Sequence, residues 1–299
     1  MRFDQVRIPL TPRSVLRCLD LGISLCGRNL LPLFALLMTV SLPILLLVGT
    51  TAVWFPDEAL VTTFASVYFA TAILGCLEVR FLAKTLFGDT VTPHQTICAN
   101  DPPIWKAVLR VLGGRIACLL AALLCVVPGL LLMVRWGFWS ESRVLRGLEE
   151  HRPDRRTGEL VKQEYSELVF RAGALTMAWL LMAGLLFITA DCATTLLFGH
   201  SILLGRFDDV TATLYDDPLV EEILTLLVDL LTTDPWVLTT AVLVLLISYL
   251  PVRAAWLLCY VDLRVRRDCW DVELAMLEEK NRLALPSPTS SVTRSSTAG

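Results

Sequence analysis

Charged side chains are scarce in this chain. Only 18% of its 299 residues are Asp, Glu, Lys or Arg, whereas about a quarter is usual in a soluble domain. Apolar residues make up 55% of the chain, and the mean hydropathy is +0.63. A single soluble core stops growing near ~250–300 residues, so it has no room for this excess. The composition therefore argues against a soluble enzyme, a disordered regulator and a nucleic-acid binder, and it predicts an integral membrane protein.

Residue patterns typical of catalysis are also missing. The three histidines, His94, His151 and His200, lie far apart in sequence. There is no HExxH, GxSxG, SxxK or glycine-rich phosphate-binding motif, and the nine cysteines form no CxxC pair or metal-binding spacing. The sequence accordingly predicts no catalytic residue, no metal site and no cofactor. An intramembrane enzyme is the least favoured interpretation.

Long apolar runs predict an all-α bundle of membrane-spanning helices. About 20 consecutive apolar residues are enough to cross the hydrocarbon core as a helix. Four runs in this chain meet that length plainly, and the region 101–148 supplies two further arms around a break at Pro128 and Gly129. The predicted membrane segments are residues 30–54, 59–77, 104–127, 129–147, 172–190 and 236–260.

Proline residues mark the predicted helix starts, because proline suits the first helical position and Thr or Asp caps the helix from the residue before. Such pairs occur at 11–12, 92–93, 101–102, 217–218 and 234–235. The first opens an amphipathic segment whose apolar side chains suit the membrane surface. Its predicted apolar face consists of Val15, Leu16, Leu19 and Ile23.

The distribution of basic residues predicts the orientation of these segments. Residues 1–29, 78–115, 135–171 and 253–299 contain 25 of the 26 lysines and arginines, and only Arg206 lies elsewhere. Basic residues favour the cytoplasmic side, so we expect six crossings in the inner (plasma) membrane with both termini in the cytoplasm. A single crossing over 101–148 would put the basic and acidic segments on the wrong sides. Whether residues 104–147 cross fully or re-enter is left open.

Charged residues on the returning arm of the hairpin need an explanation. Arg135, Glu141 and Arg143 all lie within the predicted segment 129–147. A charge at membrane depth costs at least ~2.5–3.5 kcal/mol. We therefore expect this arm to face the bundle instead of lipid. The alternative is a helix that ends at Arg135, with Trp136 and Trp139 marking the interface.

Arginines near the inner interface indicate a site for an anionic phospholipid headgroup, because the guanidinium fork suits phosphate and the cytoplasmic leaflet is anionic. We expect Glu141 to pair with one arginine when the site is empty. Ordinary positive-inside anchoring with snorkelling side chains is the competing explanation. The candidate headgroup or polar bundle site comprises Arg135, Glu141, Arg143, Arg253, Arg264 and Arg266.

The C-terminal region predicts a cytoplasmic helix over residues 261–285 and a disordered Ser/Thr/Pro-rich tail over 286–299. The helix carries an apolar stripe that either packs on the protein's own cytoplasmic loops or docks a protein partner. The stripe consists of Leu263, Trp270, Leu274 and Leu277.

Three short stretches of the chain resemble a known membrane domain. They are residues 11–16 with 28–29, residues 127–130 with 134–136, and residues 260–266 followed by Asp271 and Glu273. In this order they resemble the membrane domain attached to some bacterial glycerophosphoryl diester phosphodiesterases, a multi-span family of unknown function. The resemblance implies a stand-alone relative with six helices and cytoplasmic ends. It implies no activity, since the family name comes from a fused catalytic domain whose His-Arg-Gly start has no match here.

These patterns favour a non-enzymatic integral membrane protein of the cell envelope, acting as an assembly, scaffold or regulatory module. Membrane lipids and a protein bound at the C-terminal helix are the expected partners. The alternative is a transporter or lipid translocator with its site at the Pro128–Gly129 hairpin. A co-purifying protein would favour the first interpretation, and flux in proteoliposomes would favour the second.

Overall fold

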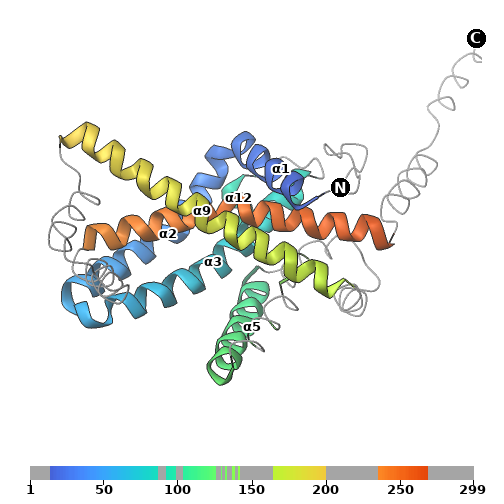
Figure 1. Cartoon of the computed structure of the whole chain (residues 1–299), viewed down its shortest axis with the longest axis horizontal. Helices are drawn as coiled ribbons and strands as arrows, with labels where there is room; N and C mark the ends of the chain where they lie inside the picture. The colour runs from blue at the N-terminus through green and yellow to red at the C-terminus, as the bar shows by residue number, and fades with distance from the viewer. Residues whose placement is uncertain are drawn as a thin grey trace, which may run out of the picture.

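The chain is all-α, as the sequence predicts. A computed structural model describes residues 14–86, 92–98, 104–125, 164–199 and 235–268, together with Gly129, Leu132, Gly137, Phe138 and Glu141. No strand occurs in these residues (Figure 1). The helices are α1 (Val15–Arg28), α2 (Leu30–Trp54), α3 (Pro56–Leu86), α4 (Pro93–Cys98), α5 (Ile104–Leu124), α9 (Tyr165–Phe198) and α12 (Pro235–Asp268).

Among the described residues, five helices are long and apolar enough to cross a membrane: α2, α3, α5, α9 and α12. The chain is therefore a multi-pass integral membrane protein. Most of the predicted segment 129–147 lies outside the described residues, and so do residues 269–285 of the predicted C-terminal helix and the predicted tail.

Several helices are longer than the apolar runs that predicted them. Helix α3 continues nine residues past the predicted end at Leu77, and α9 begins seven residues before Ala172. Helix α12 runs through residue 260 to Asp268 without a break. The added turns carry charged residues that the bundle pairs or buries, as described below.

Proline residues begin three of these helices, α3, α4 and α12, at Pro56, Pro93 and Pro235. At α4 the preceding Thr92 forms a reciprocal cap with Gln95. The Gln95 backbone N–H donates to Thr92 Oγ1 at 3.3 Å, and the Thr92 N–H donates to Gln95 Oε1 at 3.1 Å. This capping box satisfies backbone donors that a helix start leaves without partners. The predicted starts at 11–12, 101–102 and 217–218 lie outside the described residues.

Helix α12 is the central element of the bundle and packs against α1, α2, α3 and α9. In Figure 1 it lies along the middle of the molecule, with its beginning and the α2–α3 turn at the left and the end of α9 at the upper left. The beginning of α9 and the end of α12 lie at the right. A hydrogen bond from Trp179 Nε1 to the Leu245 carbonyl, 3.0 Å long, ties α9 to α12 midway along their length.

The bundle buries a face of α1 beside the apolar face predicted for the membrane surface, of which Val15 and Leu19 are partly buried against the core. Cys18, Gly22 and Cys26 are buried against the bundle, whereas Leu16 and Ile23 are exposed. A Cβ atom on Gly22 would lie 2.7 Å from the Pro251 carbonyl oxygen and 2.9 Å from the Ala255 nitrogen. The backbones of α1 and α12 approach so closely that small side chains, and not the largest apolar ones, occupy the contact.

The outer faces of α5 and α9 are apolar and exposed. Only 11% of the most apolar window of each helix is buried inside the protein, compared with 67% for α12. Leu181 and Leu185 of α9 are both 65% exposed. Such surfaces suit lipid tails, in which an exposed leucine carries no cost.

Candidate functional site

The bundle buries an ion pair between the predicted hairpin arm and α12. Glu141 Oε1 lies 2.5 Å from Arg253 Nη2, with the glutamate side chain 0% and the arginine side chain 12% exposed. Arg253 is 18 residues after Pro235, about 27 Å along the helix at 1.5 Å per residue. Removing one member of a buried pair typically costs about 3–5 kcal/mol, because the other charge stays buried. This pair therefore makes a strong link between the two segments.

Aromatic contacts hold the segment around Glu141 against the same face of α12. The Phe138 ring stacks on Trp256 with ring centroids 4.6 Å apart, and it lies 5.1 Å from the ring of Tyr260. Trp256 Nε1 donates a hydrogen bond of 3.2 Å to the Gly137 carbonyl. Positions 253, 256 and 260 share one face of a helix, so Gly137, Phe138 and Glu141 contact that face over two turns.

Helix α3 approaches the ion pair at Gly75 and Glu78. A Cβ atom on Gly75 would lie 2.8 Å from Tyr249 Oη and 3.1 Å from Arg253 Nε, so the absence of a side chain lets both residues cover α3. One turn further, Glu78 is 0% exposed and lies within electrostatic range of Arg253 and Glu141. Glu78, Glu141, Tyr249 and Arg253 are called the Arg253 cluster below.

Helix α1 closes the cluster from another side. Cys26 on α1 lies near Glu78: burial is the main cause that raises the pKa of its thiol, and the Glu78 carboxyl is the second. Within the described residues, neither carboxylate oxygen of Glu78 has a hydrogen-bond partner. The cluster thus combines two carboxyl groups, a tyrosine and an arginine in a closed apolar setting.

Helix α5 adds a second arginine beside the cluster. The Arg115 guanidinium lies over the Tyr68 ring, 4.9 Å from its centroid, and donates hydrogen bonds to the Tyr68 carbonyl and to Thr71 Oγ1. It also lies within electrostatic range of Tyr249. Tyr68 is about 18 Å along α3 from Pro56, so Arg115 reaches the middle of an apolar helix. Arg115 falls in both the predicted cytoplasmic segment 78–115 and the predicted membrane segment 104–127, and neither prediction assigned it a role.

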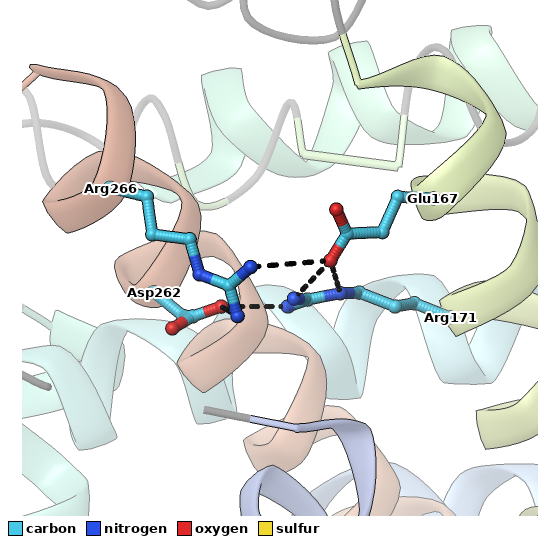
Figure 2. Close-up of polar contacts among 4 residues, drawn as sticks. All are labelled: Glu167, Arg171, Asp262 and Arg266. Atoms are coloured by element: carbon cyan, nitrogen blue, oxygen red, sulfur yellow. Dashed lines mark hydrogen bonds and ion pairs between the residues drawn. The ribbon is translucent and has the colours of Figure 1, made fainter. Parts of the chain in front are cut away.

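A second group of charges, two buried and two partly exposed, joins α9 to α12 (Figure 2). Arg171 donates from Nε to Glu167 Oε1 at 2.9 Å and from Nη1 to Asp262 Oδ2 at 3.0 Å. Arg266 pairs with the same Asp262 oxygen at 3.1 Å and lies 3.6 Å from Glu167. The Arg171 and Asp262 side chains are 3% and 1% exposed. These four residues, the Arg171 network, carry balanced formal charges.

The structure brings together only part of the predicted headgroup site. Glu141 and Arg253 pair directly, whereas Arg266 belongs to the Arg171 network. Arg264 is 7% exposed. The remaining members, Arg135 and Arg143, lie outside the described residues.

The predicted hairpin break is described only in part, because Pro128 is outside the described residues. A Cβ atom on Gly129 would lie 2.7 Å from Ala122 Cα, seven residues earlier. Residues this far apart in a continuous helix are separated by about 10 Å, so Gly129 is folded back onto the end of α5. A tight hairpin at this position requires such a contact.

The predicted docking stripe is represented by one residue. Leu263 is 5% exposed and belongs to the hydrophobic core, so the protein itself covers this position. Trp270, Leu274 and Leu277 lie outside the described residues.

Sequence reasoning missed Glu78, Arg115 and the pairing of Arg171. The usable signal was spacing: Gly75 and Glu78 are one helical turn apart, and Glu167 with Arg171 and Asp262 with Arg266 are opposite charges four residues apart. In the residues that the structure describes, no group of three or more His, Cys, Asp or Glu could hold a metal ion.

Comparison with known proteins found no matching family model, no matching curated protein and no matching solved structure.

Proposed function

We propose that this integral membrane protein of the cell envelope is not an enzyme and that it binds and translocates an anionic phospholipid. The observation that carries the proposal is the buried Glu141–Arg253 pair. Ionisable groups inside a membrane bundle are costly and usually mark substrate pathways or relays. This pair joins the hairpin arm to the central helix. It can break and re-form when Arg253 exchanges Glu141 for another anion.

Phosphate is the ligand that the chemistry of Arg253 favours. Its guanidinium can bind a phosphate through two parallel hydrogen bonds, as it can a carboxylate. In the described state Glu141 occupies this position, 2.5 Å from Nη2. A lipid phosphate would therefore replace one carboxylate on Arg253, and release of Glu141 would remove the ion pair that joins it to α12.

The first prediction is that Glu141→Gln increases the retention of phosphatidylglycerol about tenfold. The variant removes the competing negative charge, and a hydrogen bond to a charged group is worth about 1.5–3 kcal/mol. Native mass spectrometry of protein extracted from vesicles of phosphatidylcholine and phosphatidylglycerol measures retention. Transfer of a fluorescent phosphatidylglycerol between leaflets of proteoliposomes measures translocation.

Glu58→Gln is the matched control, because Glu58 is an exposed carboxylate in the first turn of α3. It should leave both measurements unchanged. Competition with inorganic phosphate separates a lipid from a soluble ligand: displacement of the lipid by phosphate alone would assign the site to a free anion. Equal retention by wild type and folded Glu141→Gln would overturn the proposal.

An assembly, scaffold or regulatory module is the second candidate, and the Arg171 network favours it. Four balanced charges tie the beginning of α9 to the end of α12, where the predicted helix 261–285 starts. Such a clamp gives a rigid base to a cytoplasmic segment that docks a protein. A stable co-purifying protein without lipid transfer would favour this candidate.

We further propose that both termini are cytoplasmic and that the membrane is the plasma membrane. The distribution of basic residues supports this orientation, as does the resemblance to the phosphodiesterase-associated membrane domain. The arrangement in Figure 1 is compatible with it, because the end of α9 and the beginning of α12 lie on the same side of the molecule as the α2–α3 turn.

The second prediction follows from this orientation. In a variant without accessible native cysteines, a cysteine at Ser142 or Gly158 should resist an impermeant thiol reagent applied to intact cells. A cysteine at Asp216 should react. Permeabilised cells provide the control for reactivity, and labelling of intact cells at position 142 or 158 would contradict the orientation.

A further inference from the structure

The Arg253 cluster contains two carboxyl groups, and Glu78 is the one outside the Glu141–Arg253 ion pair. Its side chain is 0% exposed, and within the described residues neither of its oxygens accepts a hydrogen bond. An ionised carboxylate in such a position costs several kcal/mol unless a donor or a cation compensates it. A neutral carboxylic acid avoids most of that cost.

The groups that face Glu78 come from three other parts of the chain. Helix α1 contributes Cys26, α12 contributes Tyr249 and Arg253, and the hairpin arm contributes Glu141. Arg253 is the one cation among these four groups, and Glu141 already lies 2.5 Å from it. Two carboxyl groups therefore share one guanidinium, and Glu141 holds it in the described state.

We propose that Glu78 is a proton-binding site that controls the Glu141–Arg253 pair. With a proton, Glu78 is neutral and leaves Arg253 to Glu141. When the O–H bond breaks, the proton leaves to water, the electron pair stays on the oxygen, and the new carboxylate competes with Glu141 for Arg253. A lipid phosphate would break the same Glu141–Arg253 pair. A role of Glu78 in transport therefore rests on the proposed function.

Infrared spectroscopy tests the site directly at neutral pH. A protonated carboxylic acid has a C=O stretching band that ionised carboxylates lack, so wild-type protein should show this band. Glu78→Gln should abolish it. Glu58→Gln, which removes an exposed carboxylate of the same helix, should leave it unchanged.

Glu141→Gln tests the coupling between the two carboxyl groups. This variant leaves Arg253 available to Glu78, so the band should weaken at the same pH as the Glu78 proton is released. Glu78→Asp serves if Glu78→Gln does not fold, because it keeps an acid and should move the band without abolishing it.

Persistence of the band in Glu78→Gln, or its absence from wild type, would overturn the proton site. A band of full strength in Glu141→Gln would overturn the coupling. The spectra need no lipid transfer, so they separate this inference from the proposed function. Lipid transfer without the band would support the proposed translocation and contradict the proton site at Glu78. The band without lipid transfer would support the proton site and contradict translocation.

Discussion

Asp262→Leu should lower the apparent free energy of unfolding in detergent by about 3–5 kcal/mol, the usual cost of breaking a buried ion pair by removing one partner. Asp262 forms ion pairs with Arg171 and Arg266, and its side chain is 1% exposed. Without it, the buried Arg171 loses its carboxylate partner on α12 and keeps Glu167 on its own helix. Thermal or denaturant unfolding followed by tryptophan fluorescence measures the loss.

The double variant Arg171→Leu/Asp262→Leu distinguishes a lost pair from a damaged core. It removes both buried charges and leaves Glu167 and Arg266, which already lie 3.6 Å apart, to pair with each other. Because apolar replacements of buried ion pairs are often neutral or stabilising, the double variant should recover most of the lost stability. Asp57→Leu, at an exposed position in the first turn of α3, should cost less than about 1 kcal/mol. Wild-type stability of the single Asp262 variant would contradict the assignment.

Gly22→Leu should separate α1 from α12. Its Cβ atom alone would lie 2.7 Å and 2.9 Å from backbone atoms of Pro251 and Ala255, and backbone atoms cannot move aside as a side chain can. Overpacking typically costs about 1–3 kcal/mol, and here the clash falls on the contact between α1 and α12. Cys18 and Cys26 lie on the same buried face, so faster reaction of these thiols with a permeant reagent reports the separation.

Gly27→Ala is the matched control for this variant. Position 27 lies on the same helix, and nothing is within 4 Å of a Cβ atom placed there. Replacing an unconstrained helical glycine with alanine should stabilise α1 by about 0.5–1 kcal/mol and leave thiol reactivity low. Equal thiol reactivity of Gly22→Leu and wild type would show that α1 does not depend on this contact.

The apolar runs were sufficient to predict the long helices but not where they end. The sequence criterion stopped one membrane segment at Leu77, because Glu78 is charged, and began another at Ala172, after Arg171. In the structure both charges are buried within the bundle, and the helices continue past them. A charge interrupts a span in lipid, but it is tolerated where another helix covers it.

The site itself depended on contacts between distant parts of the chain. Arg171 and Asp262 are 91 residues apart, and Trp256 and Gly137 are 119 residues apart. Local patterns predicted that Glu141 would pair with an arginine, but they could not determine which one. For α1 the pattern predicted a face for the membrane surface, but it gave no sign of the Cys18–Gly22–Cys26 face that meets α12, because the closeness of two backbones decides that packing.

Helix α12 has a consequence for biosynthesis. A polypeptide emerges from the ribosome N-terminus first, so the helix that contacts α1, α2, α3 and α9 is made after all of them. Until it enters the membrane, Arg171 has no Asp262, Glu141 has no Arg253, and the small-residue face of α1 has no neighbour. The earlier helices must therefore wait in the bilayer as an incomplete assembly, and the final insertion step converts them into one cooperative unit.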